Sequence, residues 1–181
     1  MRLQAAPKLT ILERLSHIAV VAAVPLFFVQ QYLENKQKKI EESLGYVESF
    51  QSDYIVSSRM AILRPWLEYS PEIEEIEKAG GISDQDLINL VESIRSTKDA
   101  DSNYGFSTSI IILTEFFDRV ATCIEARLCD GKTVDKALSM YASSFNCLYG
   151  PSIINLRRDL NLTAFGDGLR ILTEKTQCPK A

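Results

Sequence analysis

An uncharged run near the N-terminus constrains this chain more than any other feature. From Leu15 to Leu33 the sequence reads LSHIAVVAAVPLFFVQQYL, 19 residues without Lys, Arg, Asp or Glu. At about 1.5 Å of rise per residue, a helix of this length spans roughly 28 Å, close to the hydrocarbon thickness of a bilayer. The run therefore predicts a transmembrane helix. Residues 1–35 would form a tail and this anchor, and residues 36–181 a separate helical soluble domain.

Two other interpretations of the run stay open. Its most apolar part, residues 18–29, is short enough for a buried or interfacial helix or for a signal peptide. A signal peptide would end in small residues at a cleavage site, whereas this run continues into Gln30-Gln31-Tyr32. A surface helix of a soluble protein would show a polar face, and none appears over these turns. We therefore favour the spanning helix.

The remaining residues have helical periodicity and no alternating strand pattern, which predicts an all-α body. A long helix should continue from the anchor and end near Arg64-Pro65, because proline disfavours helix in the residue before it. Ser83 and Asp86 form a capping pattern for a later helix. A break is expected at Gly150-Pro151. The expected helices cover residues 36–63, 71–79, 83–96, 106–129, 133–149, 152–162 and 169–176.

Charge and cysteine content argue against several classes of protein. Residues 68–101 hold ten acids and three bases, a net charge of −7, and residues 102–181 hold eight acids and nine bases, a net charge of +1. No segment has the basic excess of a general nucleic-acid binder, so no DNA partner is expected. The cysteines form no CxxC pair and the only histidine is remote, so neither a metal site nor a cofactor is expected. Four separate, buried thiols would suit a reducing compartment and a cytoplasmic body. The cysteines are Cys123, Cys129, Cys147 and Cys178.

One face of the predicted anchor is polar at both ends and apolar in the middle. If several copies assembled around an axis, this face would give wet vestibules on either side of a hydrophobic gate. An ordinary anchor also has polar ends and an apolar middle, so the pattern does not require a pore. The candidate pore-lining residues are Glu13, His17, Val20, Val24, Phe27 and Gln31.

A short string late in the chain resembles the active-site motif of the helical nucleases called HEPN domains. That motif has an arginine, a polar residue, a spacer and a histidine that handles protons. Arg158 and Asp159 match its first half, Asn161 lies in the spacer, and Thr163 occupies the histidine position. Threonine cannot replace imidazole as an acid or base near neutral pH. The motif is therefore degenerate, and we expect Arg157 and Arg158 to serve assembly or docking rather than catalysis.

The layout of the chain resembles two overlapping groups of proteins. One is a bacterial membrane-anchored, all-helical family of unknown function, whose central helix has a motif like Leu113–Val120 (LTEFFDRV). The other is the small membrane accessory protein of type VI-B RNA-targeting CRISPR systems, which is similar in its single anchor, helical body and divergent HEPN-type motif. The second resemblance implies an oligomeric membrane pore that strengthens phage defence, with an RNA-guided nuclease or its RNA products as a possible partner.

The sequence thus predicts a non-enzymatic, single-pass inner-membrane protein whose partners are the bilayer and its own copies. Its leading function is that of a pore-forming accessory or effector protein in antiphage defence. One alternative is a membrane-tethered HEPN-like RNA-binding or nuclease module, against which the missing histidine argues. The other is a non-catalytic helical adaptor.

Overall fold

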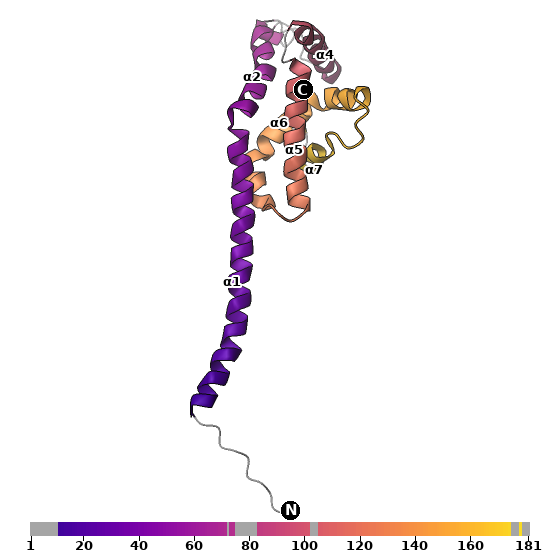
Figure 1. Cartoon of the computed structure of the whole chain (residues 1–181). Helices are drawn as coiled ribbons and strands as arrows, with labels where there is room; N and C mark the ends of the chain where they lie inside the picture. Colours follow the sequence, from indigo (N-terminus) through magenta and orange to yellow (C-terminus); the bar gives the residue numbers. More distant parts are fainter. Residues whose placement is uncertain (1–10, 72, 75–82, 102–104, 175–177, 179–181) are drawn as a thin grey trace, which may run out of the picture. The chain divides into compact units, whose positions relative to one another are not determined.

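The computed structural model describes residues 11–71, 73–74, 83–101, 105–174 and 178, of which 11–22, 84 and 99–101 are described as backbone only. Within these ranges every regular element is a helix, so the predicted all-α class is confirmed (Figure 1). The chain divides into two compact units, residues 1–38 and residues 39–181. The second unit, called the body below, contains the hydrophobic core.

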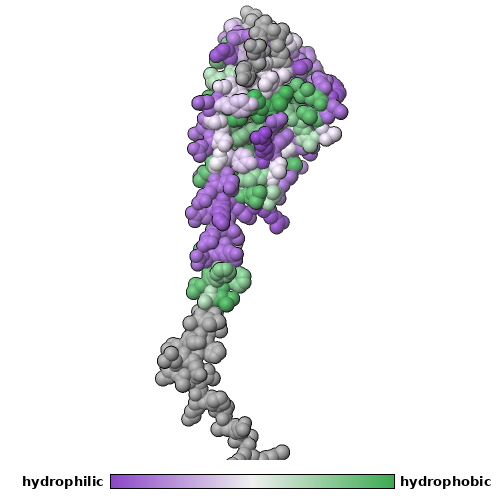
Figure 2. Space-filling model, viewed as in Figure 1, coloured by the Kyte–Doolittle hydropathy of each residue, from purple (hydrophilic) through white to green (hydrophobic). Residues whose placement is uncertain are grey.

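The first helix, α1 (Ile11–Phe50), is 40 residues long and includes the predicted anchor. Its apolar residues from Val24 to Val29 are mostly more than half exposed. Figure 2 shows them as a green band where the described side chains begin, followed along the helix by a purple polar stretch. Among helices whose side chains are described, none is both long and apolar enough to span a bilayer. Residues 15–22, which form the first part of the predicted span, are described by their backbone only and are not covered by this statement.

The helix predicted over residues 36–63 is interrupted, so that prediction was wrong. α1 ends at Phe50, and α2 (Asp53–Glu68) begins after Ser52, which has the extended backbone of an N-cap residue (φ −65°, ψ 150°). An acid in the first turn of a helix, here Asp53, is stabilised by the helix dipole. The prediction that the helix ends at Arg64-Pro65 was also wrong. Helix α2 continues to Glu68, and Pro65 is buried in its last turn.

The next helix, α4 (Asp84–Asp101), begins as its sequence predicts. The Asp86 backbone amide donates to Ser83 Oγ at 3.2 Å, and the Ser83 amide donates to the Asp86 carboxylate at 3.2 Å, which is a reciprocal capping box. Helical spacing predicts an inner face of Leu87, Leu90, Val91 and Ile94. Val91 and Ile94 are fully buried, and Leu87 and Leu90 are partly buried. The helix extends into residues expected to be loop. The predicted short helix over residues 71–79 lies mostly outside the described residues.

The centre of the body is α5 (Phe106–Glu125), which contacts α2, α4, α6 and α7 (Figure 1). Helical spacing predicts an apolar stripe of Ile110, Leu113, Phe117, Val120, Ile124 and Leu128. The first four are fully buried and Ile124 is partly buried, whereas Leu128 lies beyond the helix and is exposed. The helix ends four residues before Cys129, earlier than predicted. The chain reverses there through Arg127, whose left-handed backbone (φ 59°) ends the helix.

The predicted break at Gly150-Pro151 is absent, since α6 (Gly131–Asp159) is continuous for 29 residues. A glycine before proline removes the Cβ that would clash with the proline ring. Burial of Tyr149, Ser152 and Ile153 on both sides of the proline holds the two halves against the core. A short helix, α7 (Asp167–Thr173), completes the body.

The cysteines are paired, which overturns the expectation of four free thiols. Cys123 bonds Cys129 across the α5–α6 turn, and Cys147 of α6 bonds Cys178 after α7. The paired Cα atoms lie 5.3 and 5.5 Å apart, within the usual range for disulfides. The cysteines therefore give no support for a cytoplasmic body.

Candidate functional site

The degenerate HEPN-like string lies at the end of α6 and in the loop that follows. Asn161 has a left-handed backbone (φ 53°) that ends the helix. The Leu162 amide donates to the Arg157 carbonyl at 2.9 Å, closing the last turn. Thr163 is exposed in the loop. The string therefore forms a helix terminus and a turn.

Arg157 ties this loop to α7. Its guanidinium donates to the Asp167 carboxylate at 2.8 Å and also to the Thr163 carbonyl. Because Asp167 is the first residue of α7, the contact spans the whole loop between the two helices. Arg157 is thus a structural clamp: its side chain is partly exposed, and its guanidinium is engaged by its own partners.

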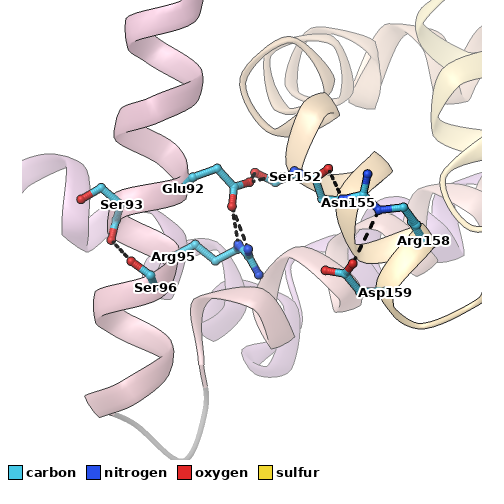
Figure 3. A network of polar contacts seen from close by, with 8 residues as sticks. All are labelled: Glu92, Ser93, Arg95, Ser96, Ser152, Asn155, Arg158 and Asp159. Atoms are coloured by element: carbon cyan, nitrogen blue, oxygen red, sulfur yellow. Dashed lines mark hydrogen bonds and ion pairs between the residues drawn. The ribbon is translucent and has the colours of Figure 1, made fainter.

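Arg158 instead belongs to an exposed polar network (Figure 3). Its guanidinium donates to the Asn155 side-chain oxygen at 3.2 Å and lies 3.7 Å from the Asp159 carboxylate. The Asn155 amide reaches Glu92 of α4, which also accepts from Ser152 at 2.9 Å and from Arg95 at 2.8 Å. Arg158 and Asp159, the two residues that match the first half of the motif, therefore lie next to a hydrogen-bonded contact between α4 and α6.

Glu92 is the acid around which that network is arranged. Burial raises the pKa of its carboxyl group. Hydrogen bonds from Ser152, Arg95 and Asn155, together with the Arg95 charge, lower the pKa by a larger amount, so the net pKa lies below its ordinary value. The carboxylate is consequently charged at neutral pH and fully engaged as an acceptor. A general acid must hold a proton at the working pH, and this group does not.

Asp118, within the motif Leu113–Val120, holds α7 against α5. Its carboxylate accepts from the Gly166 amide at 2.7 Å and from the Leu169 amide at 2.9 Å. These amides lie at the start of α7, where a helix has unpaired N–H groups and favours negative charge. The motif is thus a folding element: its two phenylalanines enter the core and its aspartate caps a neighbouring helix.

The predicted pore face is described only in part. Glu13, His17 and Val20 lie where α1 is described as backbone alone. Val24, Phe27 and Gln31 are exposed, as are Leu26 and Phe28 on other sides of the helix. Apolar side chains are therefore exposed at successive positions from Val24 to Val29 of α1, and polar residues follow them along the helix.

A cavity between α2 and α6 was not predicted from the sequence. Its volume is about 410 Å³, within the range of small-molecule pockets. The apolar wall includes Val56, Met60 and Leu63 of α2 with Phe145 and Leu148 of α6, and the charged group at its edge is Arg59. A single arginine within the apolar stripe of α2 is the signal that could have indicated it.

Arg157 and Arg158 give a matched test of clamp against surface charge. Arg157→Ala should lower the free energy of unfolding by about 1–2 kcal/mol, since it leaves Asp167 and the Thr163 carbonyl without a donor. Arg158→Ala should cost under about 0.5 kcal/mol, as expected for an exposed ion pair. Urea unfolding followed by circular dichroism measures both, and equal losses would contradict the clamp.

Comparison of this chain with protein-family models, with curated proteins and with solved structures finds no match.

Proposed function

We propose that this protein is a membrane-anchored, non-catalytic effector that acts as an oligomer, with copies of α1 assembling in the bilayer around a pore. The observation that carries the proposal is the exposure of the apolar segment of α1. Phe27 and Phe28 are 62 % and 63 % exposed although they point about 100° apart. Apolar surface of this kind on all sides of a helix is covered in proteins by lipid or by other helices.

Oligomerisation follows from the proposed activity, because one helix cannot enclose a water path. In a closed ring, each copy of the helix contacts a neighbour on two of its sides. A third side faces lipid and a fourth faces the central axis. The face with Val24, Phe27 and Gln31 is the candidate for the axis, since it combines apolar residues with a polar end at both termini of the run.

The disulfides support a body on the oxidising side of the membrane, in place of the cytoplasmic body expected from the sequence. Disulfides persist in the periplasm and outside the cell and are rare where thiol reductants are abundant. The basic residues flanking the run, three on each side, do not oppose this orientation. An RNA-guided nuclease or its RNA products would then be in a different compartment from the body, so we do not propose direct contact with either.

The RNA-binding or nuclease alternative has less support than the effector. Arg157 is occupied by Asp167 and the Thr163 carbonyl, and Thr163 supplies no proton-transfer group. The non-catalytic adaptor remains the alternative to the pore. Substitution of Phe27, which lies on the proposed pore face, distinguishes the two, because only a pore would make the membrane leaky.

Two measurements on the full chain test the anchor and the orientation. The expressed protein should stay in the membrane pellet after carbonate extraction. When cells are quenched in acid and the denatured protein is alkylated with a maleimide-polyethylene glycol, we expect no mass shift without prior reduction and a shift for four thiols after it. Recovery in the carbonate supernatant would contradict the anchor, and alkylation without reductant would contradict the body's compartment.

A further inference from the structure

We propose that the cavity between α2 and α6 binds the acyl chain of a fatty acid, with Arg59 holding the carboxylate. This proposal does not depend on the pore, because every residue that carries it lies in the body. It assigns a ligand-binding site to a region that the proposed function leaves unused.

The cavity has the lining that an acyl chain requires. Met60 and Leu63 of α2 are about half exposed at its mouth, and Phe145 is buried behind them. A cavity of about 410 Å³ with mostly aliphatic and aromatic walls favours an apolar ligand over a sugar or a nucleotide, which need several polar partners.

Arg59 makes the site selective for an anion. Its guanidinium carbon lies 4.4 Å from the centre of the Phe50 ring and 4.9 Å from that of Tyr141, so the charge lies over two adjoining aromatic rings. Its Nε atom is buried and has no hydrogen-bond partner. Among the described residues no carboxylate forms an ion pair with Arg59, whereas Arg95 and Arg157 each have one.

The neighbouring tyrosine does not supply the missing negative charge. Burial raises the pKa of the Tyr141 hydroxyl, and the charge of Arg59 and a hydrogen bond between the two side chains offset this only in part, so the phenol is neutral at physiological pH. A partly buried guanidinium without a counter-charge is costly, and a carboxylate accepts two parallel hydrogen bonds from it. A ligand with a carboxylate head and an apolar tail satisfies both features of the site at once.

The only tryptophan of the chain, Trp66, lies in the cavity wall, where its Nε1 donates to the Tyr149 hydroxyl at 2.6 Å. Its fluorescence therefore reports occupancy of this site alone. The probes are ω-brominated dodecanoate, whose bromine quenches tryptophan at short range, and ω-brominated dodecanol, which has the same chain without the charge. The protein is the full chain held in amphipol.

We expect saturable quenching by the acid, and weaker binding of the alcohol. Arg59→Gln should weaken binding of the acid about tenfold or more, as loss of a charge-assisted hydrogen bond does, and leave the alcohol unchanged. Arg64→Gln is the matched control, because Arg64 is an exposed arginine of the same helix outside the cavity. Its affinities should equal those of the unmodified chain.

A second variant keeps the test decisive if Arg59→Gln does not fold. Leu148→Phe narrows the cavity from α6 and leaves both Arg59 and the single tryptophan in place, so it should reduce binding of acid and alcohol alike, which competition between brominated and unbrominated probes measures. Equal affinity for acid and alcohol in the unmodified chain would overturn the proposal. So would non-saturable quenching, or a change of oligomeric mass in Leu148→Phe with no change in binding, which would make this face a protein contact.

Discussion

Replacing Gly168 by alanine is expected to lower the melting temperature of the full chain by roughly 10 °C. A Cβ atom at this position would lie 2.6 Å from the Asp118 Cα atom and 2.9 Å from the Ala121 Cβ atom. Both neighbours are fixed on α5, so α7 itself must move. The Asp118 carboxylate would then lose the amides of Gly166 and Leu169. Overpacking and the loss of these two hydrogen bonds together cost about 3 kcal/mol.

The control for this change is Gly45→Ala. Gly45 lies within α1, and apart from the neighbouring backbone of that helix no atom comes within 4 Å of the position its Cβ would occupy. Alanine is favoured over glycine inside a helix by about 0.5–1 kcal/mol, so this variant should melt at the same temperature or slightly higher. Thermal unfolding in amphipol, followed by circular dichroism, measures both variants. A Gly168→Ala protein that melts with the unmodified chain would show that α7 is free to move away from α5.

The contact between α5 and α7 shows how far periodicity predicts this fold. Spacing identified the apolar stripe of α5, because Ile110, Leu113 and Phe117 recur every three or four residues. The same rule assigns Asp118 no role, since its partners are amides 48 and 51 residues later in the chain. Local pattern therefore gives the buried face of a helix but not the polar group that fixes its neighbour.

The wrong helix boundaries have a similar cause. Gly150-Pro151 is a strong local breaker, yet burial of Tyr149 and Ile153 on either side outweighs one missing backbone hydrogen bond. At Ser52-Asp53 the local signal was present, an N-cap serine followed by an acid, but the helical spacing of apolar residues continues across it. Tertiary packing decides such cases, and the packing energy of a residue is known only once the fold shows which residues it contacts.

The candidate sites were predicted less well than the helices. Cys147 and Cys178 are 31 residues apart and meet only because α7 turns back toward α6. Arg157 and Arg158 were predicted as a pair, but the helix turn points one toward Asp167 and the other toward solvent. Arg59 was missed because its neighbours Phe50 and Tyr141 come from two other helices. Only the fold shows that these two rings surround an arginine that has no acidic partner.

Replacing Phe27 by serine is expected to open the proposed pore without its trigger. Val20, Val24 and Phe27 share one helical face, and a ring of such side chains excludes water because confined water loses hydrogen bonds. Each copy contributes one phenylalanine, so the substitution acts on the whole ring. A fall of about 1.4 kcal/mol in the free energy of the open, wetted state raises the open population tenfold. Expression of Phe27→Ser should therefore depolarise the membrane, measured with a potential-sensitive dye, and slow growth.

Phe28→Ser is the matched control for this experiment. The residue removed and the residue introduced are the same, the two positions differ by about 1.5 Å along the helix, and their exposed fractions are 63 % and 62 %. The cost of inserting serine into the bilayer is thus equal, while Phe28 points about 100° away from the proposed axis. We expect Phe28→Ser to leave the membrane potential near that of the unmodified chain. If the two variants depolarise cells equally at equal abundance, the face of Phe27 does not line a pore. The α1 helix is then an anchor alone, and the body acts as a tethered adaptor.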